Sequence, residues 1–230
     1  MDKVSAIIVA GGSGKRMRMN IKKQYILLND KEVLAHTIEK FNNSKCIDEI
    51  IVVVGEEEID TTIENIINKY GYSKVKKVVA GGKERQDSVY NGLINTSKDI
   101  DYVMIHDGAR PFIKEQTIES ALKTVKEKKA CVVAVPVKDT IKIVGQTSNV
   151  IEYTPARETL WSVQTPQSFE KELLISAYEY GKINQLQVTD DSMLVEAYGQ
   201  NVYIVEGDYT NIKITTPEDL SIAKGILEQV

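Results

Sequence analysis

Short apolar runs alternate with amphipathic stretches along the chain, and this alternation predicts the fold class. Apolar residues recur at helical spacing around Ile38 and around Ile118, and lysines and glutamates occupy the opposite face of the second stretch. Five other runs, rich in valine and isoleucine, are typical of buried parallel strands. They span residues 5–10, 49–54, 77–80, 102–105 and 131–135. This order of strands and helices predicts an α/β fold, a mostly parallel sheet flanked by helices with right-handed crossovers.

The last predicted helix carries its own start signal. Residues 216–219 supply a threonine N-cap, a first-turn proline and two acidic residues that suit the positive end of the helix dipole. Just before this helix, Lys213 lies on a run typical of a strand. No internal repeat and no linker-like segment divides the sequence, so residues 1–230 are expected to form a single domain.

One segment, residues 138–154, breaks the alternation. Apolar residues flank a polar centre at 145–149, which is typical of a β-hairpin that projects from the main sheet. A two-stranded hairpin is only marginally stable alone. This arm, at about residues 138–157, is therefore expected to be either an ordinary surface hairpin or a dimerisation arm that packs on a second subunit.

The composition excludes several classes of protein. The chain has 230 residues, 42% of them hydrophobic, and is long enough to bury a core without a disulfide or a metal. Its 29 basic and 33 acidic residues give a net charge of −4, which argues against a nucleic-acid partner. Apolar runs are too short for a membrane helix, and the N-terminus lacks the pattern of a signal peptide. We therefore expect a cytoplasmic protein. The two cysteines are isolated in sequence and indicate neither a disulfide framework nor a zinc site.

A glycine-rich segment follows the first predicted strand. Residues 10–17 read Ala-Gly-Gly-Ser-Gly-Lys-Arg-Met, so glycines and two cations lie at the carboxyl end of a strand, where α/β sheets bind ligands. Glycines let backbone N–H groups approach phosphate oxygens. A Walker A loop would need glycine at Val9 and a hydroxyl residue at Arg16, and a dinucleotide fingerprint would need glycine at Met17. The segment is therefore expected to bind phosphates in another way, or else to be a turn with solvated charges.

A carboxylate follows the fourth predicted strand. Asp107 lies where an acidic residue facing a phosphate loop would hold a magnesium ion between phosphates. The alternative is an aspartate that caps the turn before Pro111. His106 is expected to be structural, as is His36, and two histidines do not make a histidine-based metal site.

Several motifs, in one order along nearly the whole chain, resemble the family of 2-C-methyl-D-erythritol 4-phosphate cytidylyltransferases. One is Ala-Gly-Gly-Lys-Glu-Arg-Gln-Asp-Ser-Val at 80–89. The others lie at residues 14–17, 23–25, 106–111, 136–142, 164–167, 189–191 and 211–215. The resemblance implies a Rossmann-like sheet of the nucleotidyltransferase type and a projecting β-hairpin arm. It also implies transfer of CMP from CTP to methylerythritol phosphate, which releases pyrophosphate in the non-mevalonate route to isoprenoids.

The resemblance also implies which residues form the site. Arg16, Lys23, Arg157 and Lys213 would be catalytic, the first two by stabilising charge on the triphosphate and the last two by aiming the attacking phosphate. The nucleotide would be bound by Ala10, Gly11, Gly12, Ser13, Gly14, Lys15, Gly82 and Ser88. The second substrate would be bound by Asp107, Gly108, Arg110, Thr140, Arg157, Thr189 and Lys213. Asp107 would hold Mg²⁺, and Arg157 would reach the active site of the neighbouring subunit in a homodimer.

Two departures from the family pattern leave alternatives open. Ala10-Gly11-Gly12 replaces the usual Ala-Ala-Gly and is similar to ribitol-5-phosphate cytidylyltransferases, so another polyol phosphate is the alternative substrate. Lys83 stands where many members carry an acid, and it is assigned no role. A different class, a nucleotide-binding module without catalysis, would need the glycine loops but not the basic residues and Asp107 together.

Overall fold

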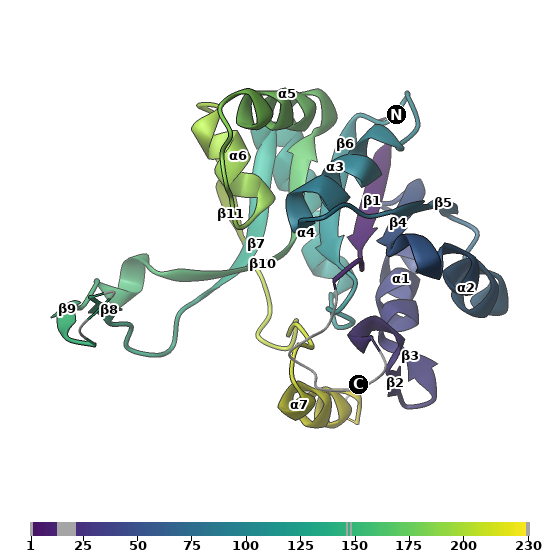
Figure 1. Ribbon diagram of the computed structural model, residues 1–230, viewed down its shortest axis with the longest axis horizontal. Coiled ribbons are helices and arrows are strands. Elements are labelled where there is room, and N and C mark those ends of the chain that lie inside the picture. Colours follow the sequence, from purple (N-terminus) through teal and green to yellow (C-terminus); the bar gives the residue numbers. More distant parts are fainter. Residues whose placement is uncertain (1, 13–21, 146, 148, 229–230) are drawn as a thin grey trace.

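The computed structural model describes the chain except for residues 1, 13–21, 146, 148 and 229–230. Within the described residues, seven strands form one mixed sheet in the order β11-β7-β10-β6-β1-β4-β5 (Figure 1). These strands are β1 (Val4–Val9), β4 (Glu49–Val54), β5 (Val75–Ala80), β6 (Tyr102–Asp107), β7 (Ala130–Pro136), β10 (Trp161–Glu170) and β11 (Tyr203–Glu206). Two short pairs lie outside the sheet, β2 (Leu27–Leu28) with β3 (Lys31–Glu32) and β8 (Ile143–Val144) with β9 (Ile151–Tyr153).

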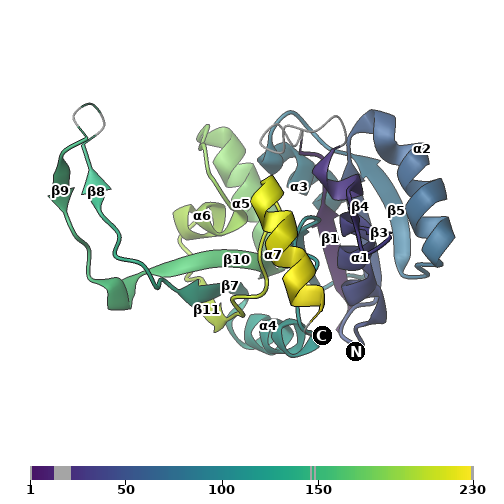
Figure 2. The same ribbon diagram turned by 90° about the horizontal axis from the view of Figure 1, so that it is seen from below.

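Helices cover both faces of the sheet (Figures 1 and 2). They are α1 (Val33–Asn43), α2 (Ile59–Thr62) with a π-helical turn after it (Ile63–Asn68), α3 (Arg85–Ile94), α4 (Glu115–Lys128), α5 (Lys171–Ile183), α6 (Asp191–Ala197) and α7 (Pro217–Leu227). Successive side chains of β1 alternate between the faces, as the strand period requires. Ala6 and Ile8 pack in the core formed with α1 and α4, whereas Ile7 packs in the core formed with α3, α5 and α6. None of the helices described is both long and apolar enough to cross a membrane.

All five strands expected from the apolar runs are present and share one direction. β1 pairs in parallel with β4 and β6, and β4 pairs in parallel with β5. The sequence did not predict β10, which lies between β6 and β7 and is antiparallel to both. Its buried positions include Gln164, Thr165, Gln167 and Ser168, so it lacks the valine-rich pattern of the other strands. β11, the other strand of this sheet that was not predicted, has four residues and lies at the edge of the sheet, parallel to β7.

The last helix confirms one local prediction, and the segment before it contradicts another. α7 begins at Pro217 after the N-cap Thr216, and Thr216 and Asp219 form a capping box. The run around Lys213, in contrast, is not a strand of the sheet. It is an extended segment fastened by the Ile214 N–H, which donates to the carbonyl oxygen of Ala109 at 2.9 Å. The prediction of a strand was wrong because this segment packs on the loop after β6 rather than beside a strand.

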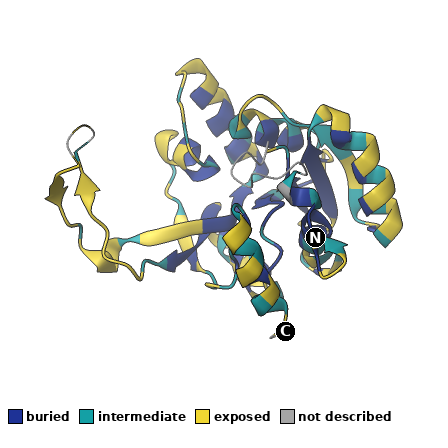
Figure 3. Cartoon of the chain, turned by 60° about the horizontal axis from the view of Figure 1, so that its bottom comes forward, coloured by how far each residue is buried: buried dark blue, intermediate teal, exposed yellow. Residues whose placement is uncertain are grey.

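The segment between β7 and β10 extends away from the sheet (Figures 1 and 2). Within it, β8 and β9 pair in antiparallel fashion. Figure 3 shows that the pair is exposed, in contrast to the central strands of the sheet. Ile151 and Tyr153 are 55% and 58% exposed. One chain therefore leaves the apolar side chains of this segment in solvent.

Candidate active site

Three loops converge at the carboxyl edge of the parallel strands. Backbone hydrogen bonds continue past the strand ends. The Ala10 N–H donates to Val53 O at 2.7 Å, the Gly81 N–H to Val54 O at 2.7 Å, and the Gly108 N–H to Val9 O at 2.9 Å. The loops after β1, β5 and β6 are thereby held side by side. Ligands of α/β sheets bind at this edge.

Glycine is required at two positions in these loops. A Cβ at Gly108 would lie 2.9 Å from the Cβ of Ala10, and a Cβ at Gly82 would lie 2.2 Å from the Cβ of Asp87. Ser88, at the start of α3, fixes the second loop, because its hydroxyl accepts from the Gly82 N–H at 3.0 Å and donates to Glu84 O at 3.1 Å. Ser88 thus shapes the turn that was expected to bind the nucleotide.

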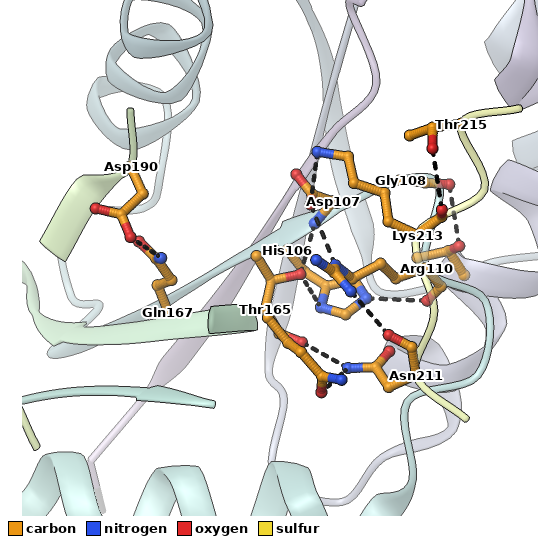
Figure 4. Close-up of polar contacts among 12 residues, drawn as sticks. His106, Asp107, Gly108, Arg110, Thr165, Gln167, Asp190, Asn211, Lys213 and Thr215 are labelled. Atoms are coloured by element: carbon orange, nitrogen blue, oxygen red, sulfur yellow. Dashed lines mark hydrogen bonds and ion pairs between the residues drawn. The ribbon is translucent and has the colours of Figure 1, made fainter. Parts of the chain in front are cut away.

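Asp107 is the centre of a cationic cluster (Figure 4). Its Oδ2 lies 2.9 Å from Lys213 Nζ and 3.3 Å from Arg110 Nε, and its Oδ1 lies 4.0 Å from Arg85 Nε. Burial opposes ionisation of this carboxyl, but the three cations outweigh burial and hold the pKa of Asp107 well below its usual range. Asp107 is therefore ionised near neutral pH, and the cluster carries excess positive charge.

Hydrogen bonds from the next strands hold the backbone of Asp107. Its N–H donates to Thr165 Oγ1 at 3.1 Å, and Thr165 Oγ1 lies 3.0 Å from His106 Nδ1. His106 Nε2 lies 3.0 Å from the carbonyl oxygen of Arg110, which can only accept. His106 is fully buried and has partners on both ring nitrogens, so the expectation of a structural histidine is confirmed. The structure assigns it to the support of Asp107.

The segment 211–214 carries Lys213 to Asp107. Arg110 Nη1 donates to Asn211 O at 2.8 Å, and Asn211 Nδ2 donates to Thr165 O at 3.0 Å. Asn211 is buried, so it links this segment to β10 and to the loop after β6. Figure 4 shows Lys213 and Arg110 converging on Asp107 above this link.

The loop that carries Thr189 is fixed by β10. Gln167 Nε2 donates to Asp190 Oδ2 at 2.8 Å, and Gln167 Oε1 accepts from the N–H groups of Asp191 and Ser192 at 3.0 and 3.2 Å. Asp190 is the N-cap of α6. One buried glutamine therefore sets both the cap and the first turn of this helix, directly after Thr189.

The structure brings many of the expected site residues together, but not all of them. Those at the shared edge, or fastened to it, are Ala10, Gly11, Gly12, Gly82, Ser88, Asp107, Gly108, Arg110 and Lys213. Thr140 and Arg157 belong instead to the segment that extends away from the body, and both are exposed. Arg157 Nη1 donates to Lys138 O at 3.3 Å within that segment. Ser13, Gly14, Lys15 and Arg16 lie outside the described residues, as does the side chain of Lys23, which begins a 3-10 turn (Lys23–Tyr25).

Two charged residues of the cluster were assigned no role from the sequence. Arg85 begins α3, and its Nη2 donates to Asp191 Oδ2 at 2.8 Å. Asp191 is 1% exposed and also accepts from the Tyr178 hydroxyl at 2.6 Å. A signal for both residues was present, because Arg85 lies in the motif at 80–89 and Asp191 in the motif at 189–191. Their pairing could not be found in this way, since the two residues are 106 positions apart.

A glycine-lined edge of parallel strands with a buried, cation-paired carboxylate defines an α/β protein that binds phosphorylated ligands. The family model of 2-C-methyl-D-erythritol 4-phosphate cytidylyltransferase matches residues 4–229. The chain belongs to this family of nucleotidyltransferases.

Individual relatives agree with the family model. A 2-C-methyl-D-erythritol 4-phosphate cytidylyltransferase of Clostridioides difficile is 55% identical over 223 residues, which cover 97% of this chain and 93% of that protein. The crystal structure of 4-diphosphocytidyl-2C-methyl-D-erythritol synthase from Anaerococcus prevotii is similar with a TM-score of 0.88 and 35% identity, covering 99% of this chain and 96% of that one. The Francisella tularensis cytidylyltransferase has a TM-score of 0.82 at 32% identity, covering 97% and 99%.

Proposed function

We propose that the chain transfers CMP from CTP to 2-C-methyl-D-erythritol 4-phosphate in the cytoplasm. A phosphate oxygen of the second substrate bonds to the α-phosphorus of CTP, and the bond from that phosphorus to the bridging oxygen of the β-phosphate breaks. The products are 4-diphosphocytidyl-2-C-methyl-D-erythritol and pyrophosphate, a step toward isoprenoid precursors. The observation that carries this proposal is the cationic cluster on Asp107, at the glycine-lined edge of a chain that belongs to this family.

The residues present suit this reaction because it needs no general base. A phosphate monoester has a second pKa of about 6, so it is largely a dianion near neutral pH and can attack directly. The main obstacle is the approach of two anions, and fixed cations reduce that cost. Lys213, Arg110 and Arg85 supply three positive charges around one edge, and Asp107 and Asp191 supply two negative charges. The excess favours a phosphorylated ligand.

Each predicted group has a distinct task in this proposal. Backbone groups of Ala10 to Gly14, together with Lys15, Gly82 and Ser88, hold the nucleotide. Arg16 and Lys23 stabilise the charge that develops on the triphosphate. Thr140, Thr189, Arg157 and Lys213 bind the phosphoalcohol, and the last two direct its phosphate at the α-phosphorus. Asp107, Gly108 and Arg110 complete this side of the site.

Asp107 fits a magnesium ion that arrives with the nucleotide. Magnesium in nucleotide sites is typically bound by one or two carboxylates together with substrate phosphates. Asp107 is ionised, and its Oδ1 lies 4.0 Å from Arg85 Nε, which is too far for a hydrogen bond. We propose that Asp107 holds Mg²⁺ with the CTP phosphates, where the ion would neutralise phosphate charge.

We further propose a homodimer joined through the arm. Thr140 and Arg157 lie on the extended segment, away from the carboxyl edge of the sheet in their own chain. A twofold-related partner would cover the exposed apolar residues of this segment and receive Arg157 in its site. Each active site would then contain groups from two chains.

The test of this function is release of pyrophosphate from CTP. The purified chain is assayed with 2-C-methyl-D-erythritol 4-phosphate and, in parallel, with ribitol 5-phosphate, each with and without Mg²⁺. We expect release with the first substrate and much less with the second. Equal or greater turnover of ribitol 5-phosphate would reject the proposed substrate. No release with either would reject cytidylyl transfer to these alcohols.

A further inference from the structure

The two oxygens of the Asp107 carboxylate have different surroundings. Oδ2 is engaged by Lys213 Nζ at 2.9 Å and Arg110 Nε at 3.3 Å. Among the described residues, Oδ1 accepts no hydrogen bond, and Arg85 Nε lies 4.0 Å from it. A free guanidinium so near a buried carboxylate would normally close to a bidentate pair. Something therefore holds Arg85 back.

Asp191 provides that restraint. Arg85 Nη2 donates to Asp191 Oδ2 at 2.8 Å, closer by more than 1 Å than its approach to Asp107. Asp191 cannot follow Arg85 toward the site, because the Tyr178 hydroxyl donates to Oδ1 of Asp191 at 2.6 Å and Gln167 Oε1 accepts from its N–H at 3.0 Å. These partners come from α5 and β10, and Asp191 is 1% exposed. A buried carboxylate fixed on two sides thus anchors Arg85.

We propose that Asp191 is a positioning residue that holds Arg85 away from Asp107 and so keeps Asp107 Oδ1 open for the magnesium ion of the bound nucleotide. This inference rests on the proposed function, because it uses the magnesium role of Asp107. It assigns different importance to the two members of one ion pair. Asp191 is needed because Arg85 is present, whereas Arg85 itself is not needed to bind the ion.

The first variant is Asp191→Asn, which keeps the shape and removes the charge. Arg85 then has Asp107 as its remaining carboxylate partner and occupies Oδ1. We expect kcat/KM to fall roughly 10- to 100-fold, as is typical when a partner that orients a metal ligand is lost. We also expect the Kd for CTP, measured by calorimetry, to rise by a similar factor with Mg²⁺ and to stay unchanged in EDTA.

The decisive variants remove Arg85. Arg85→Gln removes a cation and so weakens phosphate binding in general, but it leaves Asp107 Oδ1 open. The ratio of its Kd for CTP in EDTA to its Kd with Mg²⁺ should therefore stay close to the wild-type ratio. Adding Arg85→Gln to Asp191→Asn should restore most of the ratio that the single Asp191→Asn change lost. If Arg85→Gln lowers this ratio as much as Asp191→Asn does, or if the double variant does not regain it, the proposal is wrong.

Tyr178→Phe is the matched control for a structural effect. It removes the hydroxyl bond to Asp191 but leaves the charge of Asp191 and its pair with Arg85. Its Tm should fall while its magnesium-dependent CTP affinity stays near wild type. If the magnesium-dependent affinity for CTP falls in proportion to Tm across all four variants, the network only stabilises the fold and the proposal is wrong. The CTP titrations need no second substrate, so a wild-type chain that binds CTP but fails to turn over methylerythritol phosphate rejects the proposed function without deciding this test.

Discussion

At the scale of single residues, the protonation of His106 follows from its neighbours. Arg110 O can only accept, so His106 Nε2 carries the proton. Thr165 Oγ1 already accepts from the Asp107 N–H, so its hydroxyl donates to His106 Nδ1. The ring of Phe41 packs on the histidine at 4.8 Å between centroids. An imidazolium could not accept from Thr165, and its charge would be fully buried.

We therefore predict a neutral His106 across the physiological range. Burial lowers its pKa to about 4. Because the unfolded chain binds this proton near pH 6.5, His106 stabilises the fold fully above that pH, and up to roughly 3 kcal/mol is lost as pH falls toward 4. An NMR titration of the two histidines measures this directly, with His36→Gln to assign the signals. A His106 pKa at or above 6.5 would contradict the assignment.

Asp107 supports a second prediction at this scale. Asp107→Asn keeps the size of the side chain but removes the charge that faces Lys213 and Arg110. We expect kcat/KM to fall by roughly 10²–10³, the range for loss of one preorganised electrostatic group, with only partial recovery in excess Mg²⁺. The control is Asp99→Asn, whose exposed carboxylate pairs with Lys3 far from the site and should leave activity unchanged. Normal turnover of Asp107→Asn at low Mg²⁺ would show that Asp107 does not hold the ion.

At the scale of elements, close packing of α3 on the sheet places the second glycine loop. α3 packs against β1 and β4, and Gly92 allows the approach. A Cβ there would lie 2.5 Å from Ile7 Cγ2 and 2.9 Å from Val53 Cγ2. Both side chains are fully buried and have no room to move. α3 can therefore pack this closely on the sheet only because Gly92 has no side chain.

A pair of identical substitutions tests this packing. Gly92→Ala should lower the free energy of unfolding by roughly 1–3 kcal/mol, the usual cost of overpacking a core. Gly225→Ala, in α7, meets no atom within 4 Å and should instead raise it by roughly 0.5–1 kcal/mol, because alanine is the better helix former. Guanidinium unfolding of both variants checks the signs. Stabilisation by Gly92→Ala would mean that α3 is not held this closely.

At the scale of the whole molecule, the extended segment is largely exposed in a single chain. It carries exposed apolar residues, among them Val144, Ile151 and Tyr153. It also carries two residues expected in the active site, Thr140 and Arg157. Both facts agree with an arm that packs on a second subunit, since a two-stranded hairpin gains little stability alone. Dimerisation and catalysis would then depend on the same segment.

Subunit mixing tests the shared site. Arg157→Ala and Lys23→Ala should each be nearly inactive, and mixing them under conditions that exchange subunits should restore activity. A mixed dimer has one site with both lesions and one with neither. With random exchange of equal amounts, about half of the dimers are mixed, so recovery should approach about a quarter of wild type. If exchange is verified and activity stays absent, Arg157 acts within its own chain.

Local patterns in the sequence were sufficient for much of this molecule. The apolar runs located five strands, because a strand buried on both faces must be apolar at nearly every position. Helical spacing located α1 and α4, an N-cap followed by proline and acidic residues located α7, and glycines after strands indicated the candidate ligand edge. These features depend on residues within a few positions of one another, so they can be read without knowing the fold.

The rest required the folded chain, because the partners are distant in sequence. β10 is a strand with polar buried positions, and its own residues do not predict a strand. It lies in the sheet because β6 and β7 pair with it on either side. Lys213 is 106 residues from Asp107, and Asp191 is 106 residues from Arg85. Two ion pairs of the site thus connect halves of the chain that no local period relates. Asp107, Arg85 and Asp191 lie at the ends of β6, α3 and α6. The packing of these three elements therefore decides which oxygen of Asp107 is engaged and which is open.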